Sequence, residues 1–208
     1  PLPGIQPCLV DAEGNEIEGT NVEGNLCIKF PWPSIIRTTY GDHNRCKEVY
    51  FSTYPGKYFT GDGCKRDENG MYRITGRVDD VINVSGHRIG TAEVEDAINT
   101  HPLVIESAVV GFPHSIKGQA IYAFVILAAT TEGSPKIKTE IIAEICSHIG
   151  AIARPEQIQF VSGLPKTRSG KIMRRILRKI ASGERTNFGD TSTLLDPLVV
   201  EEILSSKE

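Results

Sequence analysis

The spacing of glycine, proline and asparagine changes near residue 80, and this change constrains the fold more than any other feature of the sequence. Before it, turn-forming residues separate short apolar runs, which is typical of antiparallel strands. The runs lie at residues 8–10, 26–30 and 35–39. After it, stretches with helical periodicity alternate with β-branched runs. The sequence therefore predicts a β-rich first part followed by a mixed α+β part.

Three stretches of the second part have helical spacing. Val94, Ala97 and Ile98 share one face after Thr91, a suitable N-cap residue. The second stretch is marked by isoleucines at positions 137, 141, 142, 145 and 149, and the third, strongly basic one by isoleucines at 172, 176 and 180. Strands are expected at residues 107–112, 120–128 and 158–161. We interpret residues 183–208 as a polar tail.

Composition limits the classes of protein to which the chain can belong. Apolar residues make up 39% of the 208, which is enough for a core, and the formal net charge of -3 gives no reason to expect nucleic acid or an anionic membrane as a partner. The five cysteines are far apart, so we expect free thiols in a reducing, cytoplasmic compartment. The five histidines lack metal-ligand spacing, so no metal site is expected.

A first candidate site is the segment Tyr-Phe-Thr-Gly-Asp-Gly at residues 58–63, which places Asp62 between two glycines. Glycines let a ligand approach the backbone closely, and a carboxylate there can accept two hydrogen bonds from a diol such as ribose. The alternative is an ordinary tight turn, in which aspartate and glycine are common. Both interpretations stay open on these residues alone.

A second candidate site lies at residues 72–90, where arginines, the adjacent Asp79 and Asp80, and glycines surround a short apolar run. Arginines such as Arg77 and Arg88 can hold phosphate or ribose through charge-assisted hydrogen bonds. The alternative is a solvated hairpin whose surface ion pairs contribute little energy. Spacing alone does not decide between them.

A third candidate site is a loop of small residues at 164–175, which carries Lys171 at the expected start of the basic helix. It is not a Walker A motif, because six residues separate Gly163 from Gly170 and Ile172 stands where serine or threonine would bind magnesium. Seven basic residues between positions 166 and 179 raise the alternative of a polyanion or membrane patch. The absence of aromatic residues and the isoleucine stripe favour packing onto the domain instead.

Taken in this order, the three segments resemble those of the adenylate-forming superfamily, which includes acyl-CoA synthetases, luciferases and the adenylation domains of peptide synthetases. Over nearly the whole chain, the sequences of these segments are most similar to those of the AMP-forming acetyl-CoA synthetases. The segments that carry the resemblance are Pro-Trp-Pro-Ser at 31–34 with Arg37, Tyr-Gly-Asp-His at 40–43, Thr-Gly-Asp-Gly at 60–63, and the runs at 76–90 and 165–181. The resemblance implies an α+β fold in which residues 1–78 end a large N-terminal AMP-binding domain, 79–182 form a mobile C-terminal catalytic domain and 183–208 form a tail.

The resemblance also implies roles for residues that bind nucleotide. Asp62 is expected to bind the ribose hydroxyls of ATP and AMP, and Arg77 to contact the nucleotide as well. Arg88 is expected to bind phosphate or to act in the second pose of the domain. Asp79 falls on the hinge about which the C-terminal domain of these enzymes rotates between an adenylate-forming and a thioester-forming pose.

Two further roles concern the acyl transfer itself. Lys171 matches the catalytic lysine of the first half-reaction, and Ser85 and Gly86 match the tunnel for the pantetheine arm of CoA. Cys146 and Ser147 stand where the acetyl-CoA synthetases have basic residues near the CoA phosphate, so a contact there stays open. Lys171 also resembles a site of inhibitory acylation, which makes lysine-acetylating and deacetylating enzymes expected partners.

The activity implied is that of a ligase converting acetate, Mg²⁺-bound ATP and CoA to acetyl-CoA, AMP and pyrophosphate through acetyl-AMP. The chain begins at Pro1 without methionine, so we expect a piece of a longer enzyme that is inactive without its large N-terminal domain. The alternatives are a propionyl-CoA or other short-chain synthetase and a non-catalytic module that retains the fold. A cytoplasmic location is expected, with a nuclear share in a eukaryote.

Overall fold

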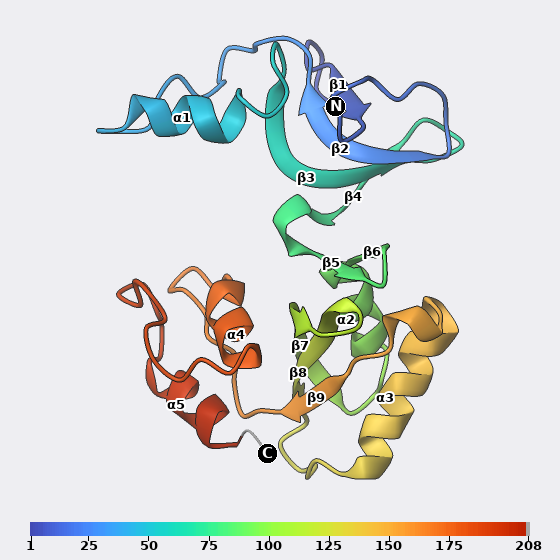
Figure 1. The fold of residues 1–208 in the computed structure, drawn as a ribbon, viewed down its shortest axis with the longest axis vertical. Coiled ribbons are helices and arrows are strands. Elements are labelled where there is room, and N and C mark those ends of the chain that lie inside the picture. Colours follow the sequence, from blue (N-terminus) through green and yellow to red (C-terminus); the bar gives the residue numbers. More distant parts are fainter. Residues whose placement is uncertain (207–208) are drawn as a thin grey trace. The chain divides into compact units, whose positions relative to one another are not determined.

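The computed structural model describes residues 1–206, which divide into two compact units (Figure 1). The first is Pro1–Asp79 and the second begins at Asp80. Each unit has its own sheet and its own buried core. No helix among the described residues is long and apolar enough to cross a membrane.

The first unit is a four-stranded antiparallel sheet accompanied by one short helix. Its strands, in spatial order, are β1 (Pro7–Val10), β2 (Val22–Ile28), β3 (Tyr58–Arg66) and β4 (Tyr72–Arg77), and the helix is α1 (His43–Tyr50). A small core forms where Cys8, Val10, Cys27 and Tyr54 are buried together. The antiparallel β-structure predicted for this part of the chain is confirmed.

Residues 35–39 differ from the prediction, because they form no strand. The amide of Ile35 instead donates to the carbonyl of Trp32 at 3.0 Å, which closes a turn. A few residues later the Asp42 side chain accepts a hydrogen bond from the amide of Arg45 at 3.0 Å and caps α1. Local turn and cap hydrogen bonds thus replace sheet pairing here.

The second unit is a five-stranded mixed sheet covered by helices. Its elements are β5 (Val81–Val84), β6 (His87–Gly90), α2 (Thr91–Asn99), β7 (Val104–His114), β8 (Gly118–Leu127), α3 (Pro135–His148), β9 (Gln157–Phe160), α4 (Arg174–Ala181) and α5 (Leu198–Ser205). Four strands run in the order β6-β5-β8-β7, and β9 pairs parallel to β8. The predicted mixed α+β class is therefore confirmed.

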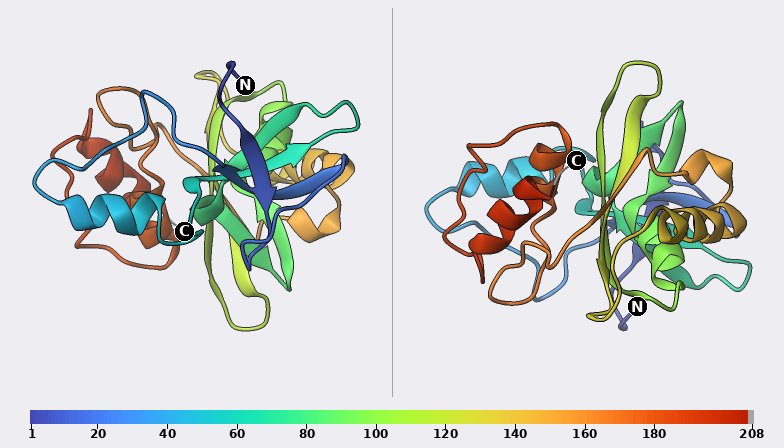
Figure 2. Two further views of the ribbon diagram at one scale, coloured as in Figure 1. Left: turned by 90° about the horizontal axis from the view of Figure 1, so that it is seen from above. Right: turned by 90° about the horizontal axis from the view of Figure 1, so that it is seen from below.

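Alternating side chains of β7 and β8 build two cores on opposite faces of this sheet. Val109 and Ala123 lie in the core covered by α2 and α3, whereas Val110 and Phe124 lie in the core covered by α4 and α5. Figure 2 shows these helix pairs on the two sides of the sheet. Because side chains on a strand alternate between faces, a sheet covered on both sides needs apolar residues at consecutive positions.

Two details depart from the sequence interpretation. Residues 183–208 were expected to be a polar tail, but the described part packs onto the sheet through Leu194, Val200 and Ile203. An apolar face one turn long within a polar stretch is a weak sequence signal. Thr91 is the first residue of α2, and the N-cap position is occupied by Gly90 without a side-chain hydrogen bond.

Candidate functional site

Asp62 and Arg77 are brought together by strand pairing in the first unit. They are register partners in the antiparallel ladder of β3 and β4, and Arg77 Nη1 lies 3.9 Å from Asp62 Oδ1. The Asp62 side chain is 25% exposed and that of Arg77 54% exposed, so both remain accessible to a ligand. The sequence placed these residues fifteen positions apart, and the hairpin makes them neighbours.

Gly61 allows the Arg77 guanidinium to lie against the backbone beside Asp62. Its φ of +79° is in the region that favours glycine, and an added Cβ would meet the Arg77 guanidinium at 3.1 Å. The ordinary-turn interpretation of residues 58–63 is wrong in one respect, since these residues lie within β3 rather than in a turn. Glycine is favoured at position 61 because the positive φ there departs locally from the extended conformation of the rest of β3.

Asp79 ends the first unit and is paired to the same arginine. Arg77 Nε donates to Asp79 Oδ1 at 3.0 Å, and the Asp79 side chain is 64% exposed. Exposed ion pairs of this kind are typically worth less than about 1 kcal/mol. Arg77 is thus shared between two carboxylates that hold it weakly.

Ser85 and Gly86 form the two-residue turn of the β5–β6 hairpin in the second unit. Both have positive φ, 50° and 85°, and Val84 pairs with His87 across the turn. This is the geometry of a tight hairpin turn, in which glycine is favoured. Ser85, Gly86 and the β6 residue Arg88 are all exposed, so the hairpin presents a backbone turn and a cation to solvent.

A cavity of about 340 Å³ adjoins this turn, and its wall contains both apolar residues and polar or charged ones. Ser85, Lys117, Arg154 and Glu156 contribute to its wall. Lys117 Nζ donates to Glu156 Oε2 at 2.6 Å, and this bond lowers the pKa of Glu156. The Arg154 side chain is exposed and forms no hydrogen bond or ion pair among residues 1–206, although its charge also contributes to the lowered pKa of Glu156.

Lys171 lies at the exposed end of a short hairpin-like loop, not at the start of the helix that the sequence predicted. Lys166 and Ile172 form an antiparallel bridge, and the amide of Lys171 donates to Thr167 Oγ1 at 3.1 Å. Gly170, with φ of +83°, makes the turn between them. The helix α4 begins only at Arg174, so the Lys171 ammonium projects from a loop closed by backbone hydrogen bonds.

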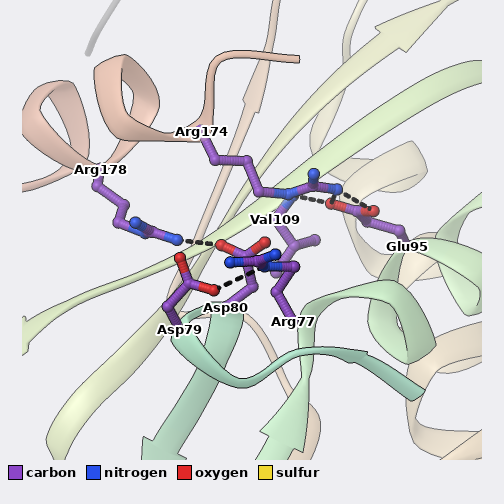
Figure 3. A network of polar contacts seen from close by, with 7 residues as sticks. All are labelled: Arg77, Asp79, Asp80, Glu95, Val109, Arg174 and Arg178. Atoms are coloured by element: carbon purple, nitrogen blue, oxygen red, sulfur yellow. Dashed lines mark hydrogen bonds and ion pairs between the residues drawn. The ribbon is translucent and has the colours of Figure 1, made fainter. Parts of the chain in front are cut away.

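The helix that follows this loop is fixed by two arginines spaced one turn apart. Arg174 Nη2 donates to Glu95 Oε1 and Oε2 at 2.7 Å each, and Arg178 pairs with Asp80 (Figure 3). Glu95 also accepts a hydrogen bond from the amide of Val109 at 2.8 Å. Burial raises the pKa of Glu95, and its bonds to Arg174 and Val109 offset part of that shift. The network ties α4 to α2, β7 and the first residue of the unit.

Glu95 and Arg174 were not singled out from the sequence. The spacing of Arg174 and Arg178 places both on one face of a helix, but it does not reveal the partners, because Glu95 is 79 residues away from Arg174. No hydrogen bond or ion pair joins Lys171 to the β5–β6 hairpin within the described part of the chain. The structure therefore presents the expected site residues in separate groups.

The potential metal-ligating side chains of residues 1–206 form no cluster, and most of the thiols are buried. Among residues 1–206 there is no group of three or more His, Cys, Asp or Glu side chains that could hold a metal. Four of the cysteines are buried, and burial raises the pKa of Cys27 to about 12. A buried thiol with a high pKa is a poor nucleophile.

Comparison with known proteins places these features in a family. Residues 93–171 match the model of the AMP-binding enzyme C-terminal domain. The chain is 60% identical over 208 residues to an acetyl-coenzyme A synthetase of Sinorhizobium medicae, an alignment covering 100% of this chain and 32% of the relative. Residues 93–171 thus form a C-terminal domain of the AMP-binding enzyme type, and the whole chain is similar to acetyl-coenzyme A synthetases, which are members of the adenylate-forming superfamily.

Solved structures agree with that assignment. The chain superposes on an anthranilate CoA ligase in complex with anthranoyl-AMP with a TM-score of 0.77 and 31% identity, over 88% of this chain and 34% of that one. The fold also matches acetoacetyl-CoA synthetase from Streptomyces lividans, with a TM-score of 0.84, 23% identity and coverage of 97% and 30%. Within the superfamily, the chain corresponds to the C-terminal portion of the acetyl-CoA synthetases, and it spans about a third of their length. The resemblance seen in the sequence is confirmed.

Proposed function

We propose that this chain is the C-terminal catalytic part of a ligase that joins acetate to CoA through acetyl-AMP, at the expense of ATP. The observation that carries the proposal is Lys171, an exposed ammonium on a hydrogen-bonded loop in a chain that is 60% identical to an acetyl-CoA synthetase. The three candidate segments then take complementary roles in nucleotide binding, adenylation and thioester formation.

The nucleotide would be held by Asp62 and Arg77. The Asp62 carboxylate offers two acceptor oxygens to a ribose diol, and the weakly paired Arg77 guanidinium can turn to the nucleotide without losing much energy. Mg²⁺ is usually bound through the phosphates of ATP with few protein ligands, which fits a chain whose described residues offer no metal cluster. Magnesium would supply charge neutralisation at those phosphates.

In the first half-reaction a carboxylate oxygen of acetate attacks the α-phosphorus, and the bond to the pyrophosphate leaving group breaks. Negative charge accumulates on the phosphoryl oxygens during this step. A lysine ammonium placed there orients two anions and stabilises the transition state. Lys171 has the exposure and the charge for this role, and Gly170 beside it adds no side chain that would obstruct the nucleotide.

In the second half-reaction the CoA sulfur attacks the acetyl carbonyl, AMP leaves, and the thiol proton passes to solvent. Ser85 and Gly86 suit the passage of a narrow pantetheine arm, because the turn presents backbone rather than bulky side chains. The adjoining cavity carries the cations of Lys117 and Arg154 against the single carboxylate of Glu156, an excess of positive charge that would favour an anionic group such as a phosphate of CoA. Arg154 would thereby compensate for the absence of basic residues at Cys146 and Ser147.

Alternation between the two half-reactions would occur by rotation at Asp79, as in hinged domain closure. The division of the chain into compact units after Asp79 supports this role, since a hinge must lie where few packed contacts cross. In the thioester-forming pose Arg88 would face the active site and Lys171 would leave it. Acylation of Lys171 by a modifying enzyme would remove its charge and so stop the first half-reaction.

The direct test is product identification with the full-length enzyme. Acetate should drive exchange of radiolabelled pyrophosphate into ATP without CoA, and adding CoA should yield AMP and acetyl-CoA in equal amounts. Propionate supplied in parallel measures acyl-chain preference. Absence of acetate- or propionate-dependent exchange would overturn the proposal.

A further inference from the structure

A segment near the C-terminus lies against the loop that carries Lys171. We call residues 187–195 the clasp. The amide of Leu195 donates to the carbonyl of Lys166 at 2.8 Å, and the amide of Arg168 donates to the carbonyl of Thr193 at 3.2 Å. Thr167 and Leu194 form an antiparallel bridge between these two bonds. The clasp therefore adds a further strand-like edge to the loop.

The clasp is itself held firmly to the second unit. Leu194 is 5% exposed and lies in the same buried core as Ile176 and Ile180 of α4. The carbonyl of Asn187 accepts a hydrogen bond from Lys179 Nζ at 2.5 Å, and the carbonyl of Asp190 accepts one from Arg175. A side chain of the core and two cations of α4 thus anchor the segment at several points along its length.

The loop closes itself through hydrogen bonds between Thr167, Gly170 and Lys171, but its tip is exposed. Residues 168–171 are exposed, and Gly170 adds conformational freedom at the residue before Lys171. Exposed loops with few buried contacts open easily, whereas a catalytic group must be held within about 0.5 Å of its working position. The loop's own bridge, between Lys166 and Ile172, holds one edge of residues 166–168. The backbone hydrogen bonds to the clasp hold the other edge and so oppose opening of the loop.

We propose that the clasp is a positioning segment for Lys171 and that it serves the adenylate-forming half-reaction. This inference rests on the role proposed above for Lys171. The clasp does not touch the reacting groups; it acts through the backbone of residues 166–168. Residues 187–195 consequently restrain the loop without belonging to the catalytic machinery, and their sequence contains no recognisable motif.

Leu195→Pro and Leu195→Ala form a matched pair of variants. The Leu195 side chain is 65% exposed, so neither change empties a core position. Proline lacks the amide hydrogen that binds the Lys166 carbonyl, whereas alanine keeps it. Proline also favours an extended conformation at the preceding residue, and the bridged Leu194 already has one.

In the full-length enzyme, Leu195→Pro should lower the kcat of acetate-dependent pyrophosphate exchange between about 10- and 100-fold, the range expected for a misplaced catalytic group. The KM for ATP and the rate of thioester formation from supplied acetyl-AMP and CoA should not change. Leu195→Ala should behave as the wild type in every assay. Equal loss of both half-reactions in the proline variant, or no loss in either, would overturn the proposal.

Hydrogen exchange separates this inference from the proposed function. Mass spectrometry of the peptide covering residues 164–173 should show faster exchange in Leu195→Pro than in Leu195→Ala. Equal rates of amide hydrogen exchange in the two variants would overturn the proposed restraint of the loop by the clasp, even if the ligase activity is as proposed. If Lys171→Ala leaves adenylation intact, Lys171 has no catalytic role in that step. Faster hydrogen exchange in Leu195→Pro would then show only that the clasp restrains the loop, and the proposal that it positions a catalytic group would be overturned.

Discussion

The two units use arginine and carboxylate in opposite ways. In the first, Arg77 is about half exposed and divides its charge between Asp62 and Asp79 at the end of a hairpin. In the second, one nitrogen of Arg174, Nη2, donates to both carboxylate oxygens of Glu95, whose side chain is only 12% exposed and which also accepts from a backbone amide.

This difference separates a site that can exchange partners from one that cannot. Breaking an exposed pair costs little because water replaces the lost partner, whereas breaking a buried pair leaves an uncompensated charge. Arg77 can therefore release Asp62 to a ligand, while Arg174 keeps α4, and with it the loop of Lys171, fixed to the rest of the unit. Under the proposed function, the same residue types would provide recognition in one unit and rigidity in the other.

The largest effect is expected from breaking the buried pair. Glu95→Ala leaves the Arg174 charge without its partner and should destabilise the second unit by about 3–5 kcal/mol. Asp79→Ala, in the exposed network, should cost less than about 1 kcal/mol. Urea unfolding followed by circular dichroism compares the two, and similar losses would remove the distinction drawn between the units.

The exposed pair should matter for binding instead. Asp62→Ala removes the proposed acceptor of two ribose hydrogen bonds and should weaken AMP binding by about 1–3 kcal/mol, with little effect on stability. Calorimetry of AMP binding to the full-length enzyme measures the loss. Glu23→Ala, an exposed carboxylate on β2, is a suitable control and should leave affinity unchanged.

Arg154, an exposed arginine that forms no hydrogen bond or ion pair among residues 1–206, sharpens the comparison further. Arg154→Ala should raise the KM for CoA between about 3- and 10-fold, as expected for one phosphate contact worth about 1 kcal/mol. The pyrophosphate exchange reaction should not change, because it needs no CoA. If dephospho-CoA shows the same sensitivity to the substitution as CoA, Arg154 does not contact the 3′-phosphate.

A smaller effect concerns the pH dependence of stability. Because burial raises the pKa of Glu95, the folded state binds its proton more tightly than the unfolded state does. The stability contribution of this proton is complete below the unfolded pKa of about 4.3 and is lost as pH rises through the folded pKa. Glu95→Gln should remove that part of the pH dependence, and identical profiles for the variant and the wild type would contradict it.

The sequence predicted best where chemistry and local pattern coincide. The isoleucine spacing of residues 137–149 predicted a helix, and the structure has α3 there, at Pro135–His148; the role of Asp62 between its two glycines stays a prediction. The buried pair of Glu95 and Arg174 could not be predicted, because long-range partners leave no periodic signal.

The C-terminal segment was missed for a related reason. Leu194 and Leu195 follow a polar stretch without helical or strand periodicity, and the role of the segment depends on backbone hydrogen bonds that side-chain types do not reveal. The sequence predicted Lys171 at the start of the basic helix, but α4 begins only at Arg174. Ile172 is instead paired with Lys166 in a bridge, so the helix starts after it. Backbone pairing across a loop is thus the feature that local sequence conveys least.

The most direct test of the account is Lys171→Ala in the full-length enzyme, with each half-reaction measured separately. Lys166→Ala is the matched control, because the neighbouring Lys166 ammonium is already paired to Glu106 at 2.7 Å. The account predicts that Lys171→Ala lowers acetate-dependent pyrophosphate exchange by about 10²- to 10³-fold while thioester formation from acetyl-AMP and CoA is retained. Loss of both half-reactions to the same degree, or of neither, would contradict it.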